Sequence, residues 1–368
     1  MKILTRFSLV VLVVVLFWSC GETKVIRVSE AGAKFTEFPD SCGIAMKKVI
    51  DVPGIITGMC LADSTLFMLN SKHGREGRSL YNYYLGSDSL SLGYVTRGRG
   101  PGEVLGANSI CLAGGKLWMF DITLEKFLVS RESVIDAMPD KAGMFAEVRL
   151  EKDRNVYALV AVLNDSAFVS SANLTSPFKV TKVNMGATPT VSHFGEYHGE
   201  VDSSYVGGLK KAFNALPFAH PSGEKLVLAY TNTDVIEIYD TQKERRLVAI
   251  HGPDNITLDF EQKQKFARAF IRDDKDDIRT FEGGAVTEEY IYLIYSGKPL
   301  RYMSNGRRLL NLGGKSILVY DWEGNPVKKF LLDKQVVSIS VSQNDEMLYA
   351  FDVNEGCLVK ADIKMQGI

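Results

Sequence analysis

The sequence lacks the short motifs that most often carry chemistry in enzymes. It contains no His-Glu-x-x-His zinc motif, no Gly-x-Ser-x-Gly nucleophile turn and no Cys-x-x-Cys pair. The acidic run 273–277 lacks the glycine and the later glutamate of a calcium-binding EF-hand loop. These absences argue against a zinc protease, a serine hydrolase of the usual type and a thioredoxin-like redox protein.

The charge pattern of a nucleic-acid-binding protein is also missing. The chain has 43 Lys and Arg against 44 Asp and Glu, a formal net charge of −1. Positive charges are interspersed with negative ones, and no basic stripe or aromatic-rich basic patch occurs. We therefore expect no nucleic-acid partner, while an apolar content of 46% allows a large buried core.

An apolar run near the N-terminus, from Phe7 to Trp18, is too short for a membrane-spanning helix of roughly 20 residues. Lys2 and Arg6 precede it, and the pattern is typical of an export signal. The residues 17–20, Phe-Trp-Ser-Cys, resemble the lipobox of bacterial lipoproteins. That resemblance implies cleavage after residue 19 and lipidation of Cys20, and the Gly21 that follows implies the outer membrane of the cell envelope.

A gapless repeat is the most informative feature of the rest of the chain. Residues 59–70 align on residues 110–121, and each segment has the pattern of strand, tight turn and strand. The end of this unit recurs at 348–352, and a second echo joins 236–240 to 317–321. Repeated units of short strands are typical of β-propeller blades.

We therefore predict an all-β, six-bladed β-propeller over residues 44–368, with four-stranded antiparallel blades, after a signal peptide (1–19) and a lipidated N-terminus with linker (20–43). The last unit shows three strands, and the run Ala45–Val52 is expected to supply the fourth, which would close the ring. The expected starts of the innermost strands are Ile55, Ala107, Phe145, Ala212, Thr280 and Val336.

Two segments interrupt the strand pattern. Apolar residues at helical spacing, after a capping Asp, predict one inserted amphipathic helix over 259–272. The segment 296–314 is expected to be a long basic loop.

The four cysteines after Cys20 are not expected to form disulfides. Cys60 and Cys111 occupy matching positions of the repeat, which should be too far apart for a bridge. Cys42 and Cys357 should lie at opposite ends of the strand pair that closes the ring.

The segment 94–103 lies where one repeat ends and the next begins. The third glycine of a phosphate-binding Gly-x-Gly-x-x-Gly motif falls on Glu103, and no Lys-Ser or Lys-Thr pair follows, so we expect a connector between blades. Arg97, Arg99 and Glu103 are expected to fix this junction by ion pairs or backbone hydrogen bonds. The residues of this motif are Gly98, Arg99, Gly100, Pro101, Gly102 and Glu103.

A polar loop in the middle of the chain carries the weak candidates for metal binding, His193, Glu196 and His198. Imidazole and carboxylate groups are zinc ligands, although a solvated polar loop has the same composition.

Three segments, Gly98–Glu103, Phe194–Tyr197 and Tyr290–Gly297, resemble the TolB-like six-bladed β-propeller lipoproteins of Gram-negative gut bacteria. The likeness covers most of the mature chain and offers no catalytic residues to carry over. Two functions stay open: a non-catalytic scaffold that binds a protein, peptide or glycan at the cell envelope, or a hydrolase or lactonase with a divalent metal in the central channel. Carboxylates, amides or imidazoles converging on that channel would favour the enzyme.

The lipid anchor can be tested directly. Cys20→Ala removes the only atom that an acyl group could occupy at this position, so the variant should move from the membrane to the soluble fraction of lysed cells. A variant that sediments with membranes as efficiently as the wild type would contradict lipidation at Cys20.

Overall fold

The computed structural model describes residues 24–27, 32–71, 77–130, 144–150, 156–197, 206–256, 258–262, 278–304, 307–363 and 365. The expected signal peptide, Cys20 and His198 lie outside the described residues. No helix in the described part of the chain is long and apolar enough to cross a membrane.

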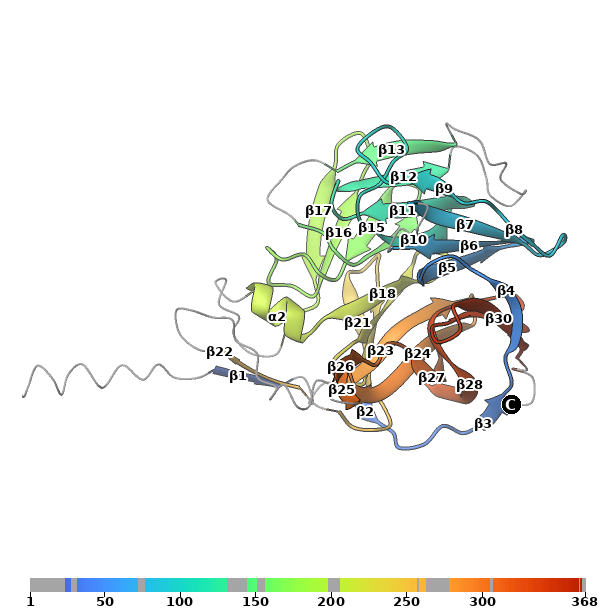
Figure 1. The fold of residues 1–368 in the computed structure, drawn as a ribbon. Helices are drawn as coiled ribbons and strands as arrows, with labels where there is room; N and C mark the ends of the chain where they lie inside the picture. The colour runs from blue at the N-terminus through green and yellow to red at the C-terminus, as the bar shows by residue number, and fades with distance from the viewer. Residues whose placement is uncertain are drawn as a thin grey trace, which may run out of the picture.

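The described strands form six blades around a common centre (Figure 1), as the repeats predicted. The first blade contains β5 (Ile56–Ala62), β6 (Thr65–Asn70) and β7 (Arg78–Tyr84), with β8 (Ser89–Leu90) and β9 (Tyr94–Thr96) both paired to β7. The second contains β10 (Ala107–Ala113), β11 (Lys116–Asp121), β12 (Lys126–Ser130) and β13 (Phe145–Arg149). The third contains β14 (Val160–Asn164), β15 (Ala167–Ser170), β16 (Val180–Asn184) and β17 (Thr190–Phe194).

The last three blades have the same order of strands. The fourth contains β18 (Ala215–Ala219), β19 (Lys225–Tyr230), β20 (Val235–Asp240) and β21 (Arg245–His251). The fifth contains β23 (Ile278–Val286), β24 (Tyr290–Pro299), β27 (Gly314–Asp321) and the first half of β28 (Pro326–Val341). The sixth contains the second half of β28, β29 (Met347–Asp352), β30 (Cys357–Asp362) and β4 (Lys47–Asp51).

The innermost strands neighbour one another in the order β5, β10, β14, β18, β23 and β28, and β28 returns to β5. Hydroxyl groups join neighbouring blades: Ser109 Oγ donates to the carbonyl oxygen of Val160 at 3.2 Å, and Ser338 Oγ to that of Ile56 at 2.8 Å. β4 pairs antiparallel with β30, which confirms that an N-terminal strand closes the last blade.

Apolar packing lies between the blades. Each of the six contacts between neighbouring blades has its own cluster of buried apolar side chains. The middle strands are therefore covered on both faces, and all six residues of β6 are buried. This burial explains why several strands are almost continuous apolar runs in the sequence.

The sequence echoes mark turns that are closed by aspartate. The Asp121 carboxylate at the end of β11 accepts the amide of Thr123 at 2.8 Å, and Asp352 at the end of β29 accepts that of Asn354 at 2.9 Å. An Asp side chain that binds the backbone two residues later stabilises such turns. The second echo also ends in such a turn: Asp240 accepts the amide of Gln242, and Asp321 accepts that of Glu323.

The N-terminal segment adds strands outside the blades. β2 (Ala33–Lys34) pairs in parallel with β21, and β3 (Ser41–Ile44) pairs in parallel with the first half of β28. Between them, the ring of Phe38 packs edge-on against Tyr320 with centroids 5.5 Å apart. Part of the segment expected to be a linker, 20–43, is therefore attached to the fourth and fifth blades.

Two strand assignments differ from the sequence prediction. Phe145 begins β13, which pairs with β12 as the fourth strand of the second blade, and the third blade begins at Val160 instead. The long connection 131–143 made this fourth strand look like the start of a new unit. The segment 296–314 is not a loop throughout, because β24 runs to Pro299 and β25 (Arg301–Ser304) forms a hairpin with β26 (Arg307–Leu310).

Residues 263–272, most of the segment predicted to be the inserted helix, lie outside the described residues. The first four residues of that segment form a strand, β22 (Asp259–Gln262), which pairs antiparallel with β1 (Lys24–Arg27). At these four residues a distant strand partner overrides the local helical pattern. The described residues contain one helix, α2 (Val206–Ala212), before the fourth blade.

The segment 94–103 joins the first blade to the second. Its turn is organised by Glu103, whose carboxylate accepts the amide of Gly100 at 2.7 Å and the hydroxyl of Thr96 at 3.2 Å. A Cβ at Gly98 would lie 1.9 Å from an oxygen of this carboxylate, so only glycine fits without displacing it. Arg97 and Arg99 are exposed.

Glu103→Ala should lower the free energy of unfolding by about 1–3 kcal/mol, because hydrogen bonds to a charged group are lost. Chemical denaturation measures the change, with Arg99→Ala as an exposed control that should stay within about 0.5 kcal/mol of the wild type. Gly98→Ala should be destabilising in the wild type and milder in the Glu103→Ala background. Additive effects of the two substitutions would contradict the contact.

Candidate functional site

A pocket of about 510 Å³ opens beside the contact between the third and fourth blades. This volume lies within the usual range for ligand sites. Aromatic and charged side chains share its wall, and the lining residues are Phe178, His193, Phe194, Gly195, Glu196, Tyr197, Tyr239, Glu244, Arg245 and Arg246.

Glu237 in β20 lies directly behind two lining residues, Tyr239 and Arg246, and is the centre of a buried cluster that we call the floor of the pocket. Ile236 and Ile238 belong to the apolar cluster shared with the fifth blade, whereas Val235 and Tyr239 belong to the cluster shared with the third. Because side chains alternate along a strand, Glu237 is directed into the contact with the third blade. Its side chain is fully buried there.

Four donors surround the Glu237 carboxylate. Lys179 Nζ lies 2.7 Å and 3.0 Å from its two oxygens, and an Arg246 guanidinium nitrogen lies 2.8 Å from one of them. The hydroxyls of Tyr230 and Tyr239 donate to the other oxygen at 2.7 Å and 2.9 Å. An isolated buried carboxylate would be very unfavourable, and this set of donors makes it tolerable.

The charges of this cluster act on one another. Burial alone would raise the pKa of Glu237, but the charge and hydrogen bonds of Lys179, with those of Tyr230 and Arg246, lower the pKa overall. Burial and the nearby Glu237 charge raise the pKa of both Tyr230 and Tyr239. The carboxylate is therefore ionised and the two phenols stay protonated at neutral pH.

A second buried lysine lies next to this cluster. Lys210 of α2 is 2% exposed, and its Nζ donates to the carbonyl oxygens of Phe178 and Lys179. Lys179 and Lys210 both lie over the ring of Tyr197, 5.5 Å and 5.6 Å from its centroid. Burial, followed by the charge of Lys179, lowers the pKa of Lys210 to about 7.

The structure brings two of the three candidate metal ligands, His193 and Glu196, to this pocket. His193 Nδ1 lies 3.1 Å from Ser176 Oγ and 3.0 Å from Thr181 Oγ1. Burial and the charge of Lys210 lower the pKa of His193. These cationic surroundings disfavour a metal ion, and a site completed by His198 stays a prediction.

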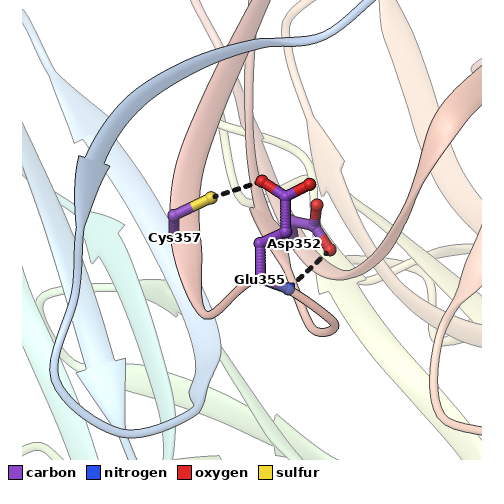
Figure 2. Close-up of side chains that lie close together, drawn as sticks. All are labelled: Asp352, Glu355 and Cys357. Carbon is purple, nitrogen blue, oxygen red and sulfur yellow. Dashed lines mark hydrogen bonds between the residues drawn. The ribbon is translucent and has the colours of Figure 1, made fainter.

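Asp352, Glu355 and Cys357 form a group with metal-ligand spacing at the turn between β29 and β30 (Figure 2). Asp352 accepts the amide of Glu355 at 3.3 Å, and Lys334 Nζ lies near both carboxylates, 3.6 Å from that of Asp352. A lysine therefore already compensates the charge of this turn. We interpret the group as part of the blade, not as a cation site.

The central channel has few groups that could bind a metal. The six innermost strands, all within the described residues, contain one carboxylate, Glu282. Burial raises the pKa of the Cys60 thiol, and the nearby Cys111 on the neighbouring innermost strand raises it further. Together with Cys42 and Cys357 they are free thiols in the structure.

The fold and the pocket define a class: a six-bladed β-propeller with a preformed site between two blades. Residues 50–344 match the family described as TolB-like 6-blade propeller-like, and the chain belongs to this family. No curated protein matches the chain.

Solved structures with a similar fold are distant in sequence. The β-propeller domain of Cps50 (Swd1) from Myceliophteria thermophila is 11% identical, with a TM-score of 0.46 over 87% of this chain and 100% of that one. The RRP9 WD40 repeats are 11% identical, with a TM-score of 0.47 over 93% and 100%. U3-55K is 12% identical, with a TM-score of 0.47 over 86% and 98%. At this level of similarity none of them carries an argument about function.

Glu237 is not among the site residues predicted from the sequence, although the repeat contains a signal of its role. The echo that aligns 236–240 with 317–321 places Glu237 opposite Leu318, which is fully buried. A charged residue where the repeat has a buried leucine requires partners. Its charged partners, Lys179 and Arg246, come from separate segments and share no motif.

Lys210 should make stability depend on pH. Its pKa is about 7 in the folded chain against the ordinary 10.5, so the unfolded chain binds more protons between these values, and stability should rise with pH through that window. From pH 7 to 9, the free energy of unfolding should rise by about 2 kcal/mol more in the wild type than in Lys210→Met. Denaturation at several pH values measures this, with the exposed neighbour substituted in Lys211→Met as the control. Parallel profiles for wild type and Lys210→Met would contradict a lowered pKa.

Proposed function

We propose that this protein is a lipid-anchored lipoprotein of the outer membrane that acts as a non-catalytic binding scaffold, with a carboxylate-bearing glycan held in the pocket between the third and fourth blades. The observation that carries the proposal is the floor of that pocket, in which one buried carboxylate holds Lys179, Arg246 and two tyrosines in fixed positions. A preformed site loses little side-chain freedom when a ligand binds.

The ionised groups at the floor support binding more than catalysis. Both oxygens of Glu237 are occupied by donors, so this carboxylate is poorly placed to accept a proton from a substrate. Lys179 is 2% exposed and is held by the same pair. These residues fix the geometry of the wall and leave recognition to the groups that line the pocket.

The pocket wall suits a ring with an acidic substituent. The His193 ring stacks on Phe178 with an interplanar angle of 12°, and Tyr197 and Tyr239 add further aromatic surface. Aromatic faces pack well against the apolar faces of sugar rings, and guanidinium groups bind carboxylates in a planar, two-pronged geometry.

Charge favours an anion at this site. Four basic residues lie in the pocket wall or are paired with it, against three acidic ones, and Lys210, whose pKa is about 7, adds a partial positive charge. The four basic residues are Lys179, Lys182, Arg245 and Arg246, and the acidic ones are Glu196, Glu237 and Glu244.

The alternative, a metal-dependent hydrolase or lactonase, needs several ligands that converge on the central channel. Glu282 is the one carboxylate of the six innermost strands, a poor donor set for a divalent ion. No observation on the described residues favours this function, and the pocket lies away from the innermost strands.

Binding to polygalacturonate, an acidic glycan, tests the assignment, with neutral dextran as the comparison. Isothermal titration should detect binding of polygalacturonate alone, and Arg245→Ala should weaken it about 10- to 100-fold through loss of a charged contact. Arg97→Ala, an exposed arginine on another blade junction, should bind like the wild type.

Two results would contradict the acidic-glycan assignment: equal binding of dextran, or unchanged affinity in Arg245→Ala. Affinity capture from an envelope extract identifies the natural ligand directly. A protein captured by wild type and by Arg245→Ala alike would place recognition elsewhere on the propeller.

A further inference from the structure

The β25–β26 hairpin carries a cluster of exposed apolar side chains. Ten large apolar side chains of the described residues are well exposed, and four of them lie in this hairpin: Tyr302 (46%), Met303 (67%), Leu309 (40%) and Leu310 (56%). Apolar groups clustered in this way mark interaction sites more often than isolated ones do.

Both faces of the hairpin are open. Tyr302 pairs with Leu309 across the strands, and the neighbouring pair, Arg301 with Leu310, points to the opposite face. All four side chains are exposed, so each face combines apolar surface with solvent access. The base is held to the propeller by Gln335, which donates to Asn311 Oδ1 at 3.0 Å and to the Leu312 carbonyl at 2.7 Å.

The charge of this segment has one sign. Residues 298–312 contain Lys298, Arg301, Arg307 and Arg308 and no acidic residue, although the whole chain has nearly equal numbers of both signs. Lys298, Arg301 and Arg307 are exposed next to the apolar side chains.

The hairpin lies on the same face of the disc as β1, the first described strand. Consecutive strands of a blade run in opposite directions, so the connection between second and third strands leaves from the same face as the connection to the next blade. The hairpin connects β24 to β27, the second and third strands of the fifth blade. β22 lies in the connection from the fourth blade to the fifth, between β21 and β23, and therefore on the same face. β22 pairs with β1; Figure 1 shows this pair at the left and the β25–β26 hairpin in the lower centre.

We propose that the β25–β26 hairpin is a second membrane contact, which inserts its apolar side chains among anionic lipid headgroups. Its orientation toward the membrane rests on the lipid anchor of the proposed function. Lys24, the first residue of β1, is four residues after Cys20, so an acylated Cys20 would hold β1 within about 14 Å of its own Cα.

A lipid surface fits this hairpin better than a protein partner does. A protein that packed on one face of the ribbon would leave the apolar groups of the other face in water, whereas the headgroup region surrounds an inserted ribbon from both sides. The basic residues beside the apolar ones match anionic headgroups, and each Lys or Arg near such a surface strengthens binding about fivefold. An acyl chain with a basic patch gives firmer attachment than either signal alone.

Vesicle flotation tests the proposal with the chain from Gly21 onward, which removes none of the described residues and carries no acyl group. This chain should bind vesicles of phosphatidylglycerol and phosphatidylethanolamine, and not vesicles of phosphatidylcholine alone. Arg301→Gln combined with Arg307→Gln should weaken binding about 30-fold. Tyr302→Ser combined with Met303→Ser should weaken it to a similar extent, and Arg97→Gln with Arg99→Gln, a matched pair on the connector between first and second blades, should not.

Failure to bind anionic vesicles, or equal binding by all variants, would overturn the hairpin proposal. Neither result bears on the lipid anchor, which is tested separately by the release of Cys20→Ala from membranes. Sedimentation velocity identifies the other occupant: a dimer that Tyr302→Ser with Met303→Ser dissociates would assign the hairpin to a second copy of the chain and overturn the lipid assignment. The glycan measurements use neither lipid nor the hairpin variants, so their outcome is independent.

Discussion

Face-to-face packing of blades is the constraint on which the rest of this molecule depends. In the described part of the chain, six apolar clusters lie at the six contacts between blades, so each blade buries its apolar residues against both of its neighbours. Such a ring has to close. The closing pair of β4 and β30 is therefore as important to the first blade as to the last. Hydroxyls such as those of Ser109 and Ser338 add hydrogen bonds between neighbouring blades, while the apolar groups supply most of the free energy.

The contact between the third and fourth blades departs from this plan in a way that produces the site. There the cluster contains an ionised carboxylate, two lysines and an arginine beside its apolar members. Burying so many charges stabilises the fold less than apolar groups of the same volume would. Its consequence is instead a rigid, polar wall at the edge of the disc, and rigidity with convergent polar groups is what a binding site requires.

Much of this fold could be predicted from the sequence because a blade is a local object. The aromatic-Asp pairs at Asp121 and Asp352 mark the ends of strands, since the carboxylate closes a turn within a few residues. The closing strand followed from counting strands in the last unit. Two expectations were wrong for reasons that are not local. Asp259–Gln262 form the strand β22 instead of the start of a helix because β1 pairs with them, and the connection 131–143 hid the true limits of the third blade. The pocket shared this difficulty, because Lys179 and Glu237 are 58 residues apart and meet only when two blades pack.

The N-terminal segment has a mechanical consequence for a tethered protein. After β1, which pairs with β22, three further strands of this segment lie in succession on the outer edges of the fourth, fifth and sixth blades, as β2 on β21, β3 on β28 and β4 on β30. A pull from the start of the chain therefore loads the pairing of β1 with β22 first, then β2, where only two residues are paired, and then β3. Tension would separate these three short pairings in turn before any load acts on the strand that closes the ring.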